Sequence, residues 1–272
     1  MAMFVRLADA CGDPLPATQK AFFRNLVALA IAGTIFLRAH DRRLKAFGRM
    51  SARDWSDLVL RAVFGTVGIF LNFHAISHIP IGDAMALNKT APFFTLALSW
   101  VLLGERMRLG QVACVAGAFG GAMLVVNPGF AGGFGVPAAL GLVSGFCAGT
   151  AYALLHRLGR RGVNGGFIIF FFSVFSCLAC VPFMAFDYHP MTVRQLLALC
   201  GAGAGAAVGQ FGITWAYRYA EPRQIAAYDY TGILFTAALG FLVFGQVPDF
   251  LSVIGFLVIT LMAVVVFSRR KG

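Results

Sequence analysis

Charged side chains are scarce in this sequence. They make up 12% of its 272 residues, whereas a soluble domain carries roughly 25%. Hydrophobic residues make up 59%, and the polar remainder is too small to cover a soluble core of this length. The composition therefore excludes a soluble enzyme or binding module. It predicts an all-α protein with many membrane-spanning helices, because each span needs about 20 mostly apolar residues.

Histidine and cysteine are also few. The chain has five histidines and six cysteines. His74 and His78 share a helix face, but no carboxylate lies between them, so packing or an interfacial position is favoured over a metal site. The cysteines lie mostly inside apolar segments and are expected to pack as small apolar side chains. We expect no disulfide framework, no metal and no cofactor.

Catalytic and energy-coupling motifs are missing. No HExxH zinc pair, no GxSx-type nucleophile and no Walker A sequence occurs. Repeated charged rings and carbonyl-filter loops, which are typical of channels, are absent as well. A carrier is therefore the favoured class and the protein is not expected to be an enzyme. An intramembrane enzyme or a channel-like facilitator is the alternative.

Length and turn signals predict ten spans, the first of them incomplete. Asn127-Pro128-Gly129 and Val247-Pro248-Asp249 mark clear boundaries. Eight residues cannot cross a bilayer, so the first helix is expected to be truncated. The predicted spans are 1–8, 20–38, 57–78, 82–103, 109–127, 135–156, 165–186, 193–217, 223–244 and 249–268.

Basic residues are distributed unevenly over the loops. With the N-terminus in the cytoplasm, sixteen Lys and Arg fall in inside loops and only Arg6, Lys20 and Arg194 in outside loops. This positive-inside bias predicts that both termini are cytoplasmic. It also accounts for the formal net charge of +11, so the charge indicates membrane topology and no nucleic-acid binding is expected. We expect a bacterial-type cytoplasmic (inner) membrane protein, with segment 39–56 as a cytoplasmic interfacial loop or short amphipathic helix in contact with anionic lipid.

An internal repeat divides the chain in half. Residues 86–105 and 227–246 align without gaps at an offset of 141, and seven of the 20 positions are identical. Each half holds five predicted spans, an odd number, so the second half enters the membrane in the opposite orientation. Two inverted repeats, 1–130 and 131–272, are the architecture of many secondary transporters that work by alternating access.

The ends of the fourth and ninth spans carry a family signature. Leu-Leu-Gly104-Glu105-Arg-Met-Arg-Leu-Gly-Gln111 precedes a helix of small residues that ends in Asn127-Pro128, and Arg24 lies in Phe-Phe-Arg-Asn. The chain in this respect resembles the drug/metabolite transporter superfamily, specifically its EamA-type ten-helix members. The resemblance implies two five-helix repeats around a central cavity that carries small organic metabolites without ATP. Gln246, where the first repeat has Glu105, departs from the pattern.

Ionisable residues inside apolar spans are functional candidates by default, because each costs about 2.5–3.5 kcal/mol to insert. Arg24 either lines the cavity or anchors the helix at the interface. Lys89 is preceded by Asn88 and followed by Pro92, so its helix should be kinked with freed carbonyls. Asp229 aligns with Asn88. Lys89 and Asp229 either bind substrate or form a structural ion pair.

The remaining candidates are polar or aromatic residues near these charges. Each competes with plain packing. The expected substrate-binding residues besides Arg24, Asn88, Lys89 and Asp229 are Asn72, His74, Tyr152, Trp215, Tyr228 and Tyr230. Asp229 is the first choice as proton carrier and His74 the second. Two cationic side chains against one carboxylate favour an anionic or zwitterionic metabolite as the small-molecule substrate.

Two glycine stripes predict close helix packing. Gly141, Gly145 and Gly149 form one, and Gly201, Gly205 and Gly209 the other. Both should let a neighbouring backbone approach closely.

The expected partners are the substrate and membrane lipid, and the sequence leaves open whether the protein is a monomer or a homodimer.

Overall fold

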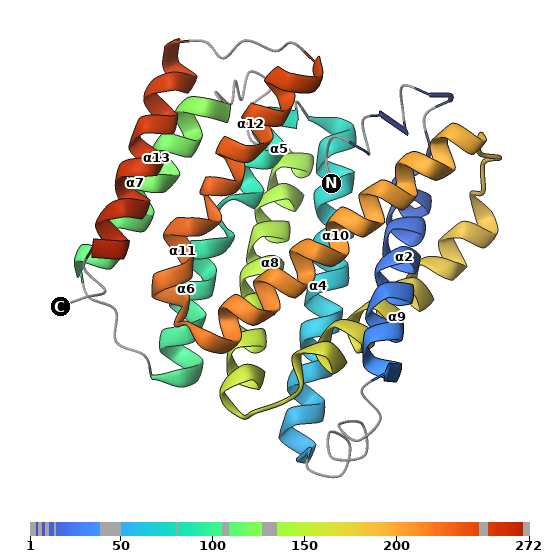
Figure 1. The fold of residues 1–272 in the computed structure, drawn as a ribbon, viewed down its shortest axis with the longest axis horizontal. Helices are drawn as coiled ribbons and strands as arrows, with labels where there is room; N and C mark the ends of the chain where they lie inside the picture. The colour runs from blue at the N-terminus through green and yellow to red at the C-terminus, as the bar shows by residue number, and fades with distance from the viewer. Residues whose placement is uncertain are drawn as a thin grey trace. The chain divides into compact units, whose positions relative to one another are not determined.

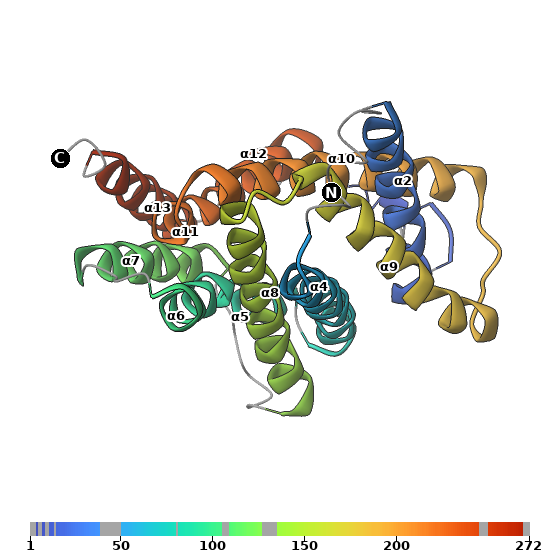
Figure 2. The same ribbon diagram turned by 90° about the horizontal axis from the view of Figure 1, so that it is seen from below.

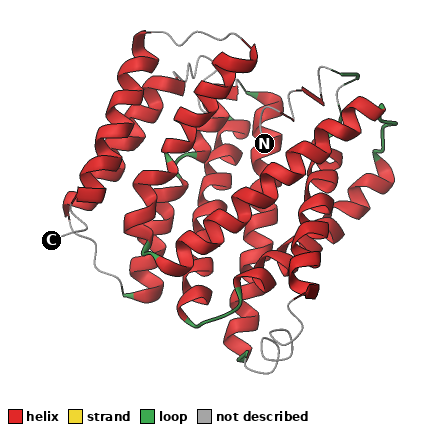
Figure 3. Ribbon diagram, in the orientation of Figure 1, coloured by secondary structure: helices red, strands yellow, loops and turns green. Residues whose placement is uncertain are grey.

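The structure is a computed structural model. It describes residues 4, 7–8, 11–13, 15–38, 50–79, 81–104, 109–126, 135–244 and 250–268. Most of the predicted first helix, most of segment 39–56, and the Glu105 and Gln246 positions lie outside the described residues. Within them all regular secondary structure is helical, as Figure 3 shows.

The predicted spans and the observed helices correspond closely. The helices are α2 (Ala17–Arg38), α4 (Ala52–His78), α5 (Ile81–Asn88), α6 (Ala91–Leu103), α7 (Leu109–Val126), α8 (Val136–Arg160), α9 (Gly165–Phe186), α10 (Val193–Tyr219), α11 (Pro222–Asp229), α12 (Thr231–Phe244) and α13 (Phe250–Ser268). Two spans predicted as single helices, 82–103 and 223–244, are each divided in two. Their division is the main departure from the sequence-based expectation.

Five described segments are long and apolar enough to cross a membrane. They are Ala52–Ala75, Ala84–Leu103, Val136–Arg160, Gly165–Phe186 and Val193–Tyr219. Two shorter apolar stretches, Val112–Val125 and Phe250–Val265, accompany them. The described part of the chain thus supports a helical membrane protein, while the number of spans and their inversion remain predictions.

The chain forms two compact units that interleave along the sequence. The first contains 1–66 and 154–219, and the second contains 67–153 and 220–272. Helices α4 and α8 contribute residues to both units. The units therefore do not follow the predicted repeat boundary at 130, and each combines parts of both halves of the chain.

The first unit is built on α2, α9 and α10, which lie side by side in Figures 1 and 2. On α2, Phe36 stacks on Phe170 of α9 with ring centroids 5.4 Å apart. The hydroxyls of Thr66 and Ser176 share a buried hydrogen bond of 2.7 Å, which ties α4 to α9. Aromatic packing and this polar contact hold the unit together without a described disulfide.

Two helices of this unit begin with the same hydrogen-bond arrangement. Ser51 and Asp54 bond reciprocally at the start of α4, with the Asp54 N–H donating to Ser51 Oγ at 3.2 Å. Thr192 and Gln195 repeat this at the start of α10, again at 3.2 Å. Both pairs are capping boxes, which satisfy the first backbone N–H groups of a helix. They lie 141 residues apart, the offset of the sequence repeat.

The second unit has α7 packed against α13, visible side by side in Figures 1 and 2. A side-chain carbon added at Gly121 would lie 2.9 Å from the Gly255 carbonyl oxygen, and one added at Gly255 would lie 2.5 Å from the Gly121 oxygen. Neither position can take a larger residue without separating the helices. Around this contact, apolar side chains including Ile259 and the fully buried Tyr230 form the core.

The first glycine stripe packs as predicted and the second does not. On α8, a side chain at Gly145 would lie 2.8 Å from the Leu87 carbonyl, and one at Gly149 would lie 2.7 Å from the Ala91 carbonyl. On α10 the close approach to α2 occurs at Gly203, 2.9 Å from the Arg24 carbonyl, while no described atom lies near Gly209. Gly203 faces α2, and Gly209 lies six residues further along, on another part of the helix surface.

Candidate functional site

Two helices of the second unit are interrupted at equivalent positions of the repeat. Helix α5 ends at Asn88 and α11 ends 141 residues later at Asp229; the helices that follow, α6 and α12, begin at Ala91 and Thr231. Interrupted helices inside a membrane expose backbone groups that no helical bond satisfies, so they occur where a binding cavity or a side chain uses those groups.

Local sequence explains the first interruption. Pro92 lies at the start of α6 and has no N–H to offer the preceding turn. Thr90, just before it, turns its hydroxyl to the Leu87 carbonyl three residues back. Thr231 does the same to the Tyr228 carbonyl at 2.7 Å in the second interruption. The threonine is common to both repeats, whereas the proline is not, so the threonine is the shared element.

Side chains from each interruption bond to the backbone of the other. The Lys89 ammonium donates to the Asp229 carbonyl oxygen at 3.1 Å. The Tyr230 hydroxyl donates to the Lys89 carbonyl oxygen at 2.9 Å. Lys89 and Tyr230 are equivalent under the 141-residue offset. The two interruptions are therefore joined by a reciprocal pair of hydrogen bonds, which we call the crossed pair.

The backbone N–H groups that would bond to the Lys89 and Asp229 carbonyls in a continuous helix bond to other carbonyls here. The Phe93 N–H donates to the Thr90 carbonyl at 3.0 Å, and the Ile233 N–H donates to the Tyr230 carbonyl at 3.0 Å. In a continuous helix these N–H groups would serve the carbonyls of Lys89 and Asp229. The crossed pair thus replaces the helical bonds given up at the breaks.

The ammonium of Lys89 also lies near a carboxylate and an aromatic ring. Its Nζ is 3.9 Å from Asp229 Oδ2, with the two side chains 20% and 25% exposed, and 6.0 Å from the centre of the Tyr230 ring. Beside it, Asn88 donates its amide to Ser144 Oγ at 3.2 Å. The site combines one cation, one anion and an amide, all partly accessible.

Comparison with known proteins identifies the chain. A model of the EamA-like transporter family matches residues 2–127 and 136–268. The chain belongs to the EamA-like transporter family. It is 30% identical over 260 residues to the pseudopaline exporter CntI of Pseudomonas aeruginosa, covering 95% of this chain and 88% of that protein. It is 25% identical over 243 residues to the riboflavin transporter of Vibrio cholerae, covering 86% and 77%.

A solved structure shares the fold of this EamA-like chain. The match has a TM-score of 0.78 at 20% identity and covers 98% of this chain and 93% of the other, whose title reads "Crystal structure of protein". Family and relatives show that the chain is an integral membrane transporter of small molecules rather than an enzyme.

Several predicted site residues of this EamA-like protein lie in the second unit but outside the crossed pair. Tyr228 is 37% exposed beside Asp229. Tyr152 lies on α8 and Asn72 on α4, both half-buried. His74 stacks on His78 at 4.1 Å between ring centroids, and its carbonyl bonds His78 Nδ1 at 2.8 Å. His74, the second choice as proton carrier, thus lies in an exposed stack of two imidazoles.

Arg24 and Trp215 belong to the first unit. Arg24 is buried on α2, where its carbonyl contacts α10 beside Gly203. Trp215 is 55% exposed near the end of α10. The structure thus brings together Asn88, Lys89, Asp229 and Tyr230 within the second unit, whereas Arg24 and Trp215 belong to the first. The role of every predicted site residue remains a prediction.

Sequence reasoning missed an ion-pair cluster in the first unit. Arg161 Nη1 lies 2.9 Å from Asp54 Oδ1 and 3.0 Å from Asp57 Oδ2. Arg157 Nη1 lies 3.4 Å from Asp57 Oδ1. The arginines were interpreted only as topology signals. Their spacing of four residues, matched by two carboxylates three apart, was the available signal for a helix-to-helix cluster.

Proposed function

We propose that this chain is a secondary active transporter of a small organic metabolite, anionic or zwitterionic, that works by alternating access between two inverted repeats. The observation that carries the proposal is the crossed pair. It places ionisable and amide side chains at two helix interruptions that the sequence repeat relates, which is where transporters of this construction bind their substrates.

Lys89 and Asp229 are proposed to bind opposite charges of the substrate. Neither side chain is sealed in the core, and at 3.9 Å their ion pair is long enough to be exchanged for contacts with a ligand. A substrate carboxylate would take the Lys89 ammonium, and a substrate ammonium would take Asp229 together with its carbonyl. A zwitterion satisfies both residues at once, so it is favoured over a simple cation.

Asp229 is also proposed as the proton carrier. Among the described residues of the second unit it is the acidic side chain at a helix interruption, and protonating it would weaken its hold on Lys89. Loss of that attraction could release substrate or allow the change of state. His74 is the weaker choice, because it stacks on His78 at an exposed site.

The proposed location is a bacterial cytoplasmic membrane with both termini in the cytoplasm. The support is the distribution of Lys and Arg over the predicted loops. Riboflavin and pseudopaline, which appear in the relatives' names, are the first compounds to test. Neither import nor export is assigned.

Counterflow in proteoliposomes tests the proposal. Vesicles loaded with unlabelled compound should transiently concentrate the labelled compound, which a channel or an enzyme cannot do. Lys89→Met should abolish counterflow, and Lys20→Met, which removes the other lysine that the structure describes, should leave it intact.

A double change separates binding from scaffolding. Removing one partner of a buried charge pair can destabilise by about 3–5 kcal/mol, so the single variant alone is ambiguous. Lys89→Met combined with Asp229→Asn leaves no unpaired charge. Counterflow restored in the double variant would show that the pair is only structural and would refute its role in binding.

A further inference from the structure

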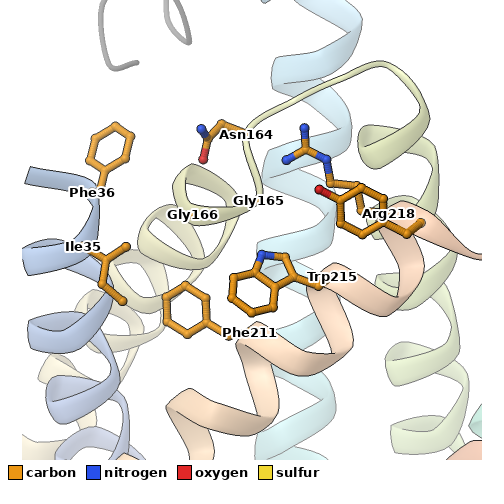
Figure 4. Close-up of a pocket in the computed structure, with 9 residues that line it drawn as sticks. Ile35, Phe36, Asn164, Gly165, Gly166, Phe211, Trp215 and Arg218 are labelled. Atoms are coloured by element: carbon orange, nitrogen blue, oxygen red, sulfur yellow. The ribbon is translucent and has the colours of Figure 1, made fainter. Parts of the chain in front are cut away.

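The first unit contains a hollow of about 480 Å³ between the end of α2, the start of α9 and the end of α10. Pockets of roughly 300–1,000 Å³ bury drug-sized molecules. Figure 4 shows Phe211 and Trp215 projecting from α10 toward Ile35 of α2. This aromatic hollow takes no part in the crossed pair, whose residues all belong to the second unit.

One wall of the aromatic hollow suits a flat ring. The rings of Phe211 and Trp215 lie 5.9 Å apart between centroids, inclined at 58°. Trp215 lines the hollow, and 55% of it is exposed beyond the protein atoms. An accessible indole beside a second ring presents a π-face on which a planar molecule can stack.

Two glycines form another part of the wall of the hollow. Gly165 and Gly166 open α9 and line the hollow. A carbon added at Gly165 would lie 3.2 Å from Thr214 Cγ2, so this glycine permits close packing of α9 on α10. Gly166 would meet only Asn164 Oδ1, at 3.2 Å. Asn164 Oδ1 accepts the Phe167 N–H at 3.2 Å, which fixes the amide at the rim.

The rim carries a cation. Arg218 lines the hollow and lies 5.7 Å from the centre of the Tyr219 ring. Among the described residues no carboxylate pairs with Arg218, in contrast to Arg157 and Arg161 of the same unit. A half-buried guanidinium that lines a hollow is suited to a carboxylate, sulfonate or phosphate group.

We propose that the aromatic hollow binds a planar aromatic molecule that carries an anionic group, with its ring stacked on Trp215 and its anion held by Arg218. The inference stands independently of the transport role proposed for Lys89 and Asp229. It assigns the first unit a ligand site of its own.

Binding of 2-naphthoate tests the proposal on the full chain in phosphatidylcholine nanodiscs, by equilibrium dialysis with empty nanodiscs subtracted. Saturable binding at one site is expected. Arg218→Gln should weaken it about tenfold, the loss expected for a hydrogen bond to a charged group, whereas Arg53→Gln, at an exposed arginine of the same unit, should not. Trp215→Leu, which keeps apolar volume but removes the ring, should weaken binding about threefold to tenfold.

Three probes and one lipid distinguish the alternatives. Uncharged 2-naphthamide and saturated decahydro-2-naphthoate should each bind more weakly than 2-naphthoate. Equal loss in the Arg53 and Arg218 variants, or unsaturable uptake in proportion to lipid, would overturn the proposal. Displacement of 2-naphthoate by phosphatidylglycerol would overturn it too, because the hollow would then be a lipid headgroup site. The Lys89→Met variant should bind 2-naphthoate as the parent does. Loss of transport in this variant therefore tests the transport proposal without affecting the test of the aromatic hollow.

Discussion

The crossed pair predicts a measurable difference between two neighbouring tyrosines. Tyr230→Phe removes a single hydroxyl from a side chain that is fully buried, leaving the Lys89 carbonyl without its 2.9 Å donor. The Phe93 N–H cannot compensate without breaking its own bond to Thr90. An unsatisfied buried acceptor costs about 1–3 kcal/mol, and the free energy of unfolding should fall by this amount.

Tyr228→Phe is the matched control. It removes the same hydroxyl two residues earlier, from a side chain that is 37% exposed and makes no described side-chain hydrogen bond. A surface change of this kind should alter stability by no more than about 0.5 kcal/mol. Reversible unfolding by SDS in mixed micelles, followed by circular dichroism, measures both variants. Equal stability of the two would refute the view that the Tyr230 hydroxyl replaces a lost helical bond.

Three further outcomes are expected. Asp229→Asn should abolish accumulation driven by a proton gradient while exchange at equal pH continues, and accumulation unchanged in this variant would exclude Asp229 as proton carrier. In a chain freed of native cysteines, a membrane-impermeant maleimide applied from outside should label a cysteine at Asp187 but not one at Arg53, and the reverse pattern would invert the topology. Gly149→Ala should lower thermal stability by about 1–3 kcal/mol because its new carbon would meet Phe94 Cβ at 2.6 Å. Gly209→Ala should not lower thermal stability, because nothing lies within 4 Å of the added carbon. Similar melting temperatures of the Gly149 and Gly209 variants would contradict the packing of α8 on α6.

Helix positions were predictable because they depend on signals carried along the chain. Span 165–186 coincides with α9, whose start is fixed by the Asn164 cap and whose apolar run is uninterrupted by charge. The sequence predicts a kink near Lys89, because Pro92 follows it and cannot donate a helical hydrogen bond. The sequence around Tyr230 does not predict the second break, because no proline follows closely. The repeat alone could have suggested it.

Contacts between distant residues were harder to predict. The sequence left open whether Lys89 and Asp229 bind substrate or form a structural ion pair, and in the structure Lys89 Nζ lies 3.9 Å from Asp229 Oδ2. The shorter bond from Lys89 to the Asp229 backbone could not be foreseen, because that carbonyl becomes available only once the helix breaks. Grouping Trp215 with these charges relied on its aromatic character, which equally suits a hollow in the other unit.

The capping boxes of α4 and α10 show that the geometry of a helix start does not depend on the charge of the residue that makes it. Ser51 with Asp54 and Thr192 with Gln195 make the same reciprocal bonds at the repeat offset. One partner is a carboxylate that binds Arg161, and the other is a neutral amide that binds the Asp13 carbonyl at 2.9 Å. The two helix starts therefore share one geometry, although the residue that makes it is charged at one start and neutral at the other.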